Sequence, residues 1–185
     1  MIVILGASCS GKDTLFKGLK QFQESVGFNC KMEYTTRPKR NVSASCLEDS
    51  YHFISKKNYV EASIAGFFVS NFTVNTQEGP WYYGIASEDT GKNDVILTNP
   101  TSFYQLKEKV PDLCSIYLKV GQRERLIRML KRGDNIHESY RRSVHDEGHF
   151  SGVSQNVNYI IDAETTERSD ILNKVLEIIK NRINE

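Results

Sequence analysis

Residues 2 to 14 read Ile2-Val3-Ile4-Leu5-Gly6-Ala7-Ser8-Cys9-Ser10-Gly11-Lys12-Asp13-Thr14, and this stretch decides the fold. Its first four residues form an apolar run typical of a buried strand. The turn that follows can aim successive backbone N–H groups at an anion, at the positive end of the helix expected from Thr14. Gly-x-x-x-x-Gly-Lys after a strand therefore predicts a phosphate-binding loop.

We expect this loop to bind ATP through nine residues: Gly6, Ala7, Ser8, Cys9, Ser10, Gly11, Lys12, Asp13 and Thr14. Lys12 is placed to reach the β- and γ-phosphates. The strict pattern has Ser or Thr after the lysine to hold Mg²⁺, and Asp13 stands there instead. Either Asp13 binds the metal or its waters, or its charge weakens phosphate binding. The remaining alternative is a glycine-rich turn without a ligand.

Apolar runs alternate with helical patterns along the rest of the chain. Further strands are predicted at 95–97, 114–120 and 159–161, and helices at 14–22, 122–131 and 171–183. This alternation predicts an α/β fold with a parallel sheet covered on both faces. The aromatic-rich and polar residues 33–84 predict an inserted small mixed or antiparallel sheet. We expect one domain with a core at 1–32, 85–126 and 150–185, an acceptor-binding insert at 33–84 and a helical lid at 127–149.

Composition excludes several classes of protein. The 24 Lys and Arg residues nearly balance the 23 Asp and Glu residues, which argues against a globally basic nucleic-acid-binding protein. The cysteines at 9, 30, 46 and 114 form no Cys-x-x-Cys pair, so reduced cytoplasmic thiols are expected. No apolar run approaches a membrane span, and no secretory signal is visible. We expect a complete cytoplasmic enzyme that has no leader and binds neither nucleic acid nor membrane.

A second anion site is predicted in the insert. Residues 35–40, Thr-Thr-Arg-Pro-Lys-Arg, place three cations within four residues, and tyrosines follow at Tyr51 and Tyr83. Arginine can hold a phosphate through two hydrogen bonds, and a tyrosine hydroxyl can add a donor. Taken alone, these segments also suit a solvated basic turn with structural tyrosines.

A third basic group lies in the expected lid. Arg128 and Arg132 are four residues apart and share a helix face. Gly133 ends that helix, and Arg141 and Arg142 begin the return. Arginines on both sides of such a hinge could close over donor phosphates and exclude water. The alternative is an exposed helix with ordinary surface charges.

Together these segments resemble the guanylate kinase family, P-loop nucleoside monophosphate kinases, over nearly the whole chain. The resemblance rests on the phosphate loop, Thr35-Thr36-Arg37-Pro38, Tyr51-His52-Phe53, Tyr83-Gly84, and Arg128 through Arg142. It implies ATP and Mg²⁺ as cofactors. Asp13, which replaces the Ser or Thr of the strict pattern, is our expected metal ligand because a carboxylate suits Mg²⁺. It also implies that acceptor phosphate is bound by Arg37, Arg40, Tyr51 and Tyr83. The lid role falls to Arg128, Arg132 and Arg142, with Arg141 as the alternative to Arg142; with Lys12 and Arg37 these form the expected catalytic set.

The resemblance breaks where the family reads guanine. Family members carry acidic side chains before the Tyr-Gly pair and after the Val-Ile-Leu strand. Here those positions fall in Gly66-Phe67-Phe68-Val69-Ser70-Asn71 and Thr98-Asn99-Pro100, and Ile85 replaces a Ser or Thr. Glu33 and Asn99 are possible replacements, so Glu33 joins the expected acceptor-binding residues.

Three functions remain open at this point. The first is phosphorylation of GMP or dGMP by ATP. The second is a kinase for another phosphorylated small molecule, a deoxynucleotide or ribose 1,5-bisphosphate. The latter is the substrate of a guanylate kinase relative that, like this chain, has Lys-Asp at the end of the loop and a Tyr-Tyr-Gly segment. The third is a non-catalytic binding module, against which the retained Lys12 and lid arginines argue. We expect small-molecule nucleotides as partners and a monomer or homodimer.

Overall fold

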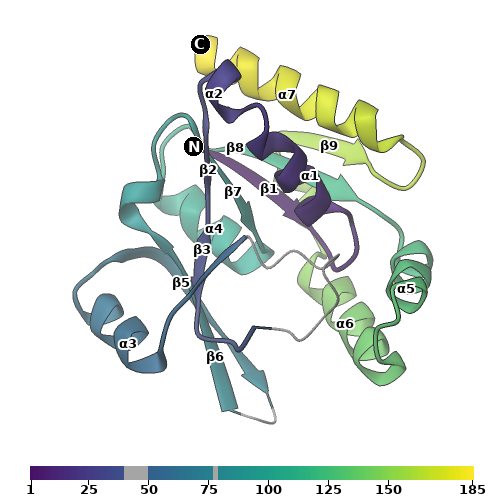
Figure 1. Ribbon diagram of the computed structural model, residues 1–185, viewed down its shortest axis with the longest axis horizontal. Coiled ribbons are helices and arrows are strands. Elements are labelled where there is room, and N and C mark those ends of the chain that lie inside the picture. The colour runs from purple at the N-terminus through teal and green to yellow at the C-terminus, as the bar shows by residue number, and fades with distance from the viewer. Residues whose placement is uncertain (40–49, 77–78) are drawn as a thin grey trace.

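The apolar run at the start of the chain forms the central strand of a parallel sheet in a computed structural model (Figure 1). The structure describes residues 1–39, 50–76 and 79–185. The strands are β1 (Ile2–Gly6), β2 (Asn29–Lys31), β3 (Glu33–Thr35), β4 (Tyr51–Phe53), β5 (Phe68–Thr76), β6 (Gly79–Ala86), β7 (Asp94–Thr98), β8 (Cys114–Lys119) and β9 (Tyr159–Asp162). The helices are α1 (Lys12–Lys20), α2 (Gln23–Val26), α3 (Lys56–Ile64), α4 (Pro100–Lys109), α5 (Gln122–Lys131), α6 (Ile136–His149) and α7 (Arg168–Asn184), with 3₁₀ turns at Ser87–Asp89 and Val153–Gln155.

Among the described residues, five strands form the core sheet in the order β2-β7-β1-β8-β9. All their pairings are parallel, and β1 lies between β7 and β8 with Ile4 opposite both Leu97 and Ile116. The α/β prediction is therefore confirmed. Because β1 is central, the loop that follows it lies at the middle of the carboxyl edge of the sheet, where α/β proteins bind ligands.

Both faces of this sheet are covered by helices. Because successive residues of a strand point to opposite sides, alternate residues of β1 pack against different helices. Ile2 and Ile4 pack with α1 and α7 in one apolar cluster. Val3 and Leu5 pack with α4 in another. Figure 1 shows α1 and α7 together on one side of the sheet and α4 on the other.

The inserted segment forms a second, mixed sheet in the order β4-β3-β6-β5 within the described residues. Strands β3 and β4 are parallel, while β6 runs antiparallel to both β3 and β5. The predicted small mixed sheet is thus present. Arg40, one of the predicted acceptor-binding residues, lies outside the described part of the chain.

The predicted helices differ from the observed ones mainly at their ends. Helix α5 has the predicted bounds, and α7 begins at Arg168, three residues before the apolar pattern. Helix α1 begins at Lys12 rather than Thr14, because Gly11 adopts a left-handed conformation (φ 94°) and starts the helix directly after the turn. Within the described ranges, no helix has both the length and the apolar character needed to cross a bilayer.

The central position of β1 leads to a stability prediction. Ile4 is 0% exposed, so Ile4→Ala should lower the free energy of unfolding by about 2–5 kcal/mol through lost apolar burial and a cavity. Ile160→Ala on the edge strand β9, where the side chain is 49% exposed, is the matched control and should cost less than about 1 kcal/mol. Urea denaturation measures both losses; equal losses would contradict the proposed core.

Candidate functional site

One cleft of about 1640 Å³ brings the three predicted basic groups together. It is lined by the phosphate loop, by the second sheet and by α5 and α6. Predicted site residues on its walls are Gly6, Ser8, Cys9, Ser10, Gly11, Lys12, Asp13, Thr14, Glu33, Arg37, Tyr51, Tyr83, Arg128, Arg132, Arg141 and Arg142. Segments far apart in the sequence therefore face one space, as a transfer between two ligands would require.

The loop turns tightly between β1 and α1. Cys9 has a positive φ of 59°, Gly11 a φ of 94°, and the N–H of Ser10 donates to the carbonyl oxygen of Ala7 at 3.1 Å. A Cβ on Gly6 would lie 2.2 Å from Oγ and 3.1 Å from Cβ of Ser10, so a larger residue there would displace the side chain of Ser10. This curvature is the geometry that collects backbone N–H groups around an anion.

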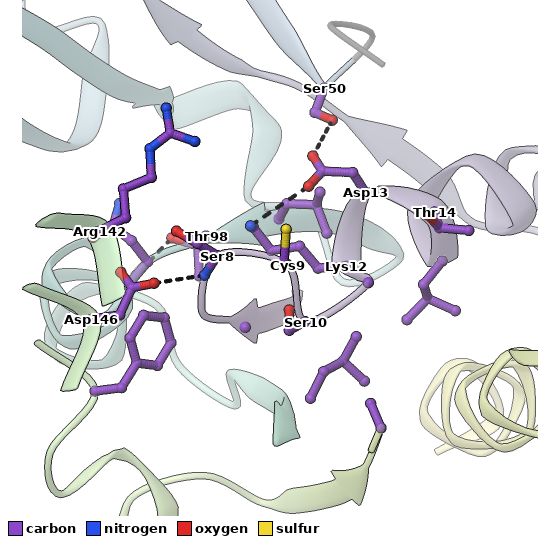
Figure 2. A pocket seen from close by; sticks show the side chains of 18 of the residues that line it. Ser8, Cys9, Ser10, Lys12, Asp13, Thr14, Ser50, Thr98, Arg142 and Asp146 are labelled. Carbon is purple, nitrogen blue, oxygen red and sulfur yellow. Dashed lines mark hydrogen bonds and ion pairs between the residues drawn. The ribbon is translucent and has the colours of Figure 1, made fainter. Parts of the chain in front are cut away.

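Asp13 lies at the mouth of the loop, between Lys12 and the second sheet (Figure 2). Oδ1 of Asp13 accepts a hydrogen bond from the hydroxyl of Ser50 at 3.1 Å, and Oδ2 lies 3.6 Å from Nζ of Lys12. Mg²⁺ in kinases takes one or two carboxylates together with water and substrate phosphates, so a carboxylate here suits that ion. Among the described residues, no group of three or more His, Cys, Asp or Glu side chains could hold a metal.

Across the cleft, Arg37 packs against two aromatic rings. Its guanidinium carbon lies 4.9 Å from the ring centre of Tyr51 and 5.1 Å from that of Phe53, and Nη1 donates to the carbonyl oxygen of Pro38 at 3.1 Å. The residue is 5% exposed. Stacking and burial orient the planar cation, which suits it to hold an oxyanion through two hydrogen bonds.

The two predicted tyrosines lie next to each other. The rings of Tyr51 and Tyr83 are 6.2 Å apart, and Tyr83 stacks on Phe72 at 4.7 Å. Burial, and then the nearby carboxyl of Glu33, raise the pKa of Tyr51 well above its usual value. Its phenol therefore stays neutral near pH 7 and can donate a hydrogen bond.

Glu33 is buried on the same wall and is 5% exposed. Within the described part of the chain, Oε1 of Glu33 has no hydrogen-bond partner. Burial raises the pKa of Glu33 to about 8, although the cations of Lys12 and Arg37 oppose the shift. A buried carboxyl group with an unused oxygen in a cleft is a strong candidate for ligand contact.

The arginines of α5 and α6 are paired with carboxylates of the same helical hairpin. Nε of Arg128 donates to Glu124 at 2.9 Å, and its Nη1 and Nη2 donate to the carbonyl oxygens of Cys9 at 3.4 Å and Ala163 at 3.1 Å. Arg132 is paired with Asp134. Arg128 thus touches the phosphate loop itself.

The two candidate arginines of the return helix share one partner. Arg141 donates twice to the carboxylate of Glu138, and Nε of Arg142 donates to it at 2.7 Å. Hydrogen bonds from Arg141 and then Arg142 lower the pKa of Glu138 to about 2. The side chain of Arg141 is the more exposed of the two, and both line the cleft.

Sequence reasoning missed Asp146, which connects α6 to the phosphate loop. Its Oδ2 accepts a hydrogen bond from the backbone N–H of Ser8 at 2.8 Å and from Nη1 of Arg125 at 3.1 Å. Arg125 is 2% exposed, and its Nη2 lies 2.5 Å from Oε1 of Glu147. Figure 2 shows Asp146 reaching Ser8, with Arg142 on the same helix four residues earlier. A lone aspartate in a helix carries no sequence signal for such a contact.

The wall where the family reads its base is polar but not acidic among the described residues. Gln105 of α4 exchanges two 2.9 Å hydrogen bonds with the backbone of Asn71. Oδ1 of Asn99 accepts from the N–H of Ser102 at 3.1 Å and so caps α4. Nε2 of His149 lies 2.8 Å from the hydroxyl of Thr101. All of these except Ser102 line the cleft, and the prediction that Asn99 reads a base is weakened by its capping role.

Comparison with known proteins identifies the fold. No protein-family model matches the chain, and no curated protein matches its sequence. Among solved structures it is similar to a guanylate kinase from Anaplasma phagocytophilum, with a TM-score of 0.66 and 15% identity over 98% of this chain and 85% of that one. It is also similar to a gluconokinase from Sinorhizobium meliloti 1021, with a TM-score of 0.53 and 12% identity over 97% of this chain and 91% of that one. The chain therefore shares the α/β fold of these two structures.

The contact between Asp146 and Arg125 can be tested through stability. Asp146→Ala removes one of the carboxylates that face the buried Arg125 guanidinium, and we expect a loss of about 3–5 kcal/mol in the free energy of unfolding. Glu147→Ala removes the more exposed carboxylate on the same guanidinium and should cost about 1 kcal/mol or less. Urea denaturation of both variants measures the difference, and a larger loss for Glu147→Ala would refute this account of the pair.

Proposed function

We propose that the protein transfers a phosphoryl group from ATP to a nucleoside monophosphate, with GMP or dGMP as the acceptor. The observation that carries this proposal is the sharing of one cleft by a phosphate loop with Lys12 and by the buried cation Arg37 with Tyr51 and Tyr83. Two anion sites that face each other are what phosphoryl transfer between two phosphates requires.

The donor half is built from backbone and one ammonium group. The N–H groups of the loop and the N-terminus of α1 would hold the β-phosphate, while Lys12 would reach the transferred group. Asp13 would hold Mg²⁺, which neutralises charge on the nucleotide phosphates when it is bound. The free thiols of Cys9, Cys30 and Cys114 suit a reducing compartment, consistent with a cytoplasmic kinase.

The acceptor half would hold a phosphate dianion. Arg37 supplies a fixed cation, and the neutral phenols of Tyr51 and Tyr83 supply donors. The attacking oxygen of a phosphate is already anionic, so this chemistry needs no general base. Positioning and electrostatic stabilisation would carry the rate.

The helical hairpin would act as a lid. Arg141 and Arg142 are paired with Glu138, whose side chain is 38% exposed, and partly exposed pairs contribute little energy. Arg132 is paired with the more buried Asp134. The phosphates of ATP could therefore replace Glu138 as the partner of Arg141 and Arg142 at small cost. Closure would place cations around the transferred group and exclude water, which would otherwise accept the phosphoryl group.

A second candidate is a kinase for another phosphorylated small molecule, such as a deoxynucleotide or ribose 1,5-bisphosphate. The polar wall of Asn71, Asn99, Thr101 and Gln105 favours it, because none of these side chains is the acid that guanine recognition uses in the family. Amides and hydroxyls at such a wall suit hydrogen bonding to sugar hydroxyls as well as to a base.

The proposed activity can be tested by supplying the protein with Mg·ATP and a panel of candidate acceptors. Release of ADP from Mg·ATP should be stimulated most by GMP or dGMP among GMP, dGMP, AMP, CMP, UMP, dTMP and ribose 1,5-bisphosphate. Lys12→Ala should lower kcat/KM about a hundredfold to a thousandfold, because one preorganised charge on the transferred group is lost. Lys57→Ala on the exposed face of α3 is the control and should leave kcat/KM unchanged. Preference for the sugar bisphosphate would support the second candidate, and the absence of turnover with every acceptor would refute both.

The acceptor site has its own kinetic signature. Arg37→Met keeps an apolar chain between Tyr51 and Phe53 but removes the cation, so the KM for the acceptor should rise about tenfold to a hundredfold. The KM for ATP should change less than about threefold, because Arg37 lies across the cleft from the donor loop. Initial rates with each substrate varied in turn measure both constants; an increase confined to the KM for ATP would show that Arg37 belongs to the donor site.

A further inference from the structure

Glu33 lines the same cleft as Lys12 and Arg37. It begins β3, where it pairs with Tyr51 of β4, and it comes four residues before Arg37. The cations that act most strongly on it are Lys12 on the donor side and Arg37 on the acceptor side. Its cross-strand neighbour Tyr51 is one of the residues proposed to hold the acceptor phosphate.

A negative charge at this position would oppose the function of the cleft. An ionised Glu33 would be buried and would repel both the acceptor phosphate and the transferred group. A neutral carboxyl group has the opposite effect, because its O–H is a donor. Glu33 lines the cleft, and its buried Oε1 has no partner among the described residues, so no hydrogen bond in that part of the protein uses this oxygen.

We propose that Glu33 works in its neutral form and donates its O–H to a phosphate oxygen of the acceptor. This inference rests on the proposed function and adds a donor beside Arg37, Tyr51 and Tyr83. It also predicts that the acceptor group at this point is a phosphate rather than a free hydroxyl. A hydroxyl acceptor would require Glu33 as an ionised base.

The direction of the pH dependence follows from the groups that surround Glu33. Burial raises its pKa to about 8, Lys12 of α1 and Arg37 lower it, and Tyr51 of β4 and Tyr59 of α3 interact with it as neutral phenols. Asp13 and Tyr83 also raise the pKa of Tyr51, the residue that pairs with Glu33. With a pKa of about 8, Glu33 is mostly neutral at pH 7, and a bound dianion favours that neutral form further. Acceptor binding should therefore weaken as the pH rises above 8.

The decisive measurement is kcat/KM for the acceptor from pH 7 to 9.5, with Mg·ATP saturating. The wild-type value should fall about 30-fold as Glu33 loses its proton. Glu33→Gln keeps a neutral donor that cannot ionise, so it should retain activity at pH 7 and vary less than about threefold across the interval. Glu61→Gln on α3 is the matched control and should follow the wild type. Thermal melting of each variant at both pH values confirms that it is folded.

Three outcomes of this measurement overturn the proposal. A parallel fall in wild type and Glu33→Gln would assign the titration to another group. A wild-type rate that rises with pH, together with an inactive Glu33→Gln, would make Glu33 a base for a hydroxyl acceptor. The wild-type profile alone also decides, because a flat profile contradicts the proposal whatever the variant does.

Binding of inorganic phosphate separates this proposal from the kinase assignment. Calorimetry at pH 8.5 in buffers of different ionisation enthalpy should show uptake of about 0.8 proton per phosphate by the wild type in excess of that by Glu33→Gln. Proton uptake without turnover of any acceptor would retain the role of Glu33 and refute the kinase activity. Phosphate that binds without this excess uptake, or does not bind, refutes the role of Glu33.

Discussion

The carboxylate of Asp146 joins the phosphate loop to both helices that face it, and the geometry of the cleft depends on this contact. It accepts from the loop through Ser8 and from α5 through Arg125. Because Arg125 is buried, separating it from Asp146 would leave a charge without compensation, which is far more costly than breaking a surface pair. We infer that the hairpin is fixed at its base. Its tip, near Arg132 and Gly133, is where closure over a nucleotide can occur.

The cations of the cleft are held in two ways. Some are paired with a carboxylate that a ligand can replace, and one packs against aromatic rings. Arg141 and Arg142 share Glu138 near solvent, so incoming phosphate can take over these cations with little loss. Arg37 lies instead in an aromatic setting, against the rings of Tyr51 and Phe53. Under the proposed function, the α5–α6 hairpin would suit a ligand that arrives and leaves with each turnover, and the Arg37 wall would orient the acceptor.

The fold was largely predictable because its signals are local. The core strands are apolar runs, and the phosphate-loop motif predicts the turn between β1 and α1. Helix α4 was missed, since its apolar pattern is weak, although Asn99 followed by Pro100 is a helix-start signal that reasoning could have used. For the site, the resemblance to guanylate kinases predicted that Lys12, Arg37, Tyr51 and Tyr83 serve one site, and all four line the cleft. Asp146 could not be predicted, because its partner Ser8 lies 138 residues away and no motif links them.

The dependence of prediction on local motifs also explains why the sequence predicts the binding of a phosphate better than it predicts the rest of the acceptor molecule. Recognition of phosphate uses cations and neutral donors, which a short motif such as Thr-Thr-Arg-Pro carries within a few residues. Recognition of a base depends on single side chains brought together from β5, β7 and α4, and the amides there can both donate and accept. Such a wall discriminates through hydrogen bonds that a mismatched ligand would leave unpaired. The proposed role of Glu33 follows the same division, because a neutral acid on this wall would add a donor for phosphate and would contribute nothing to the choice of base.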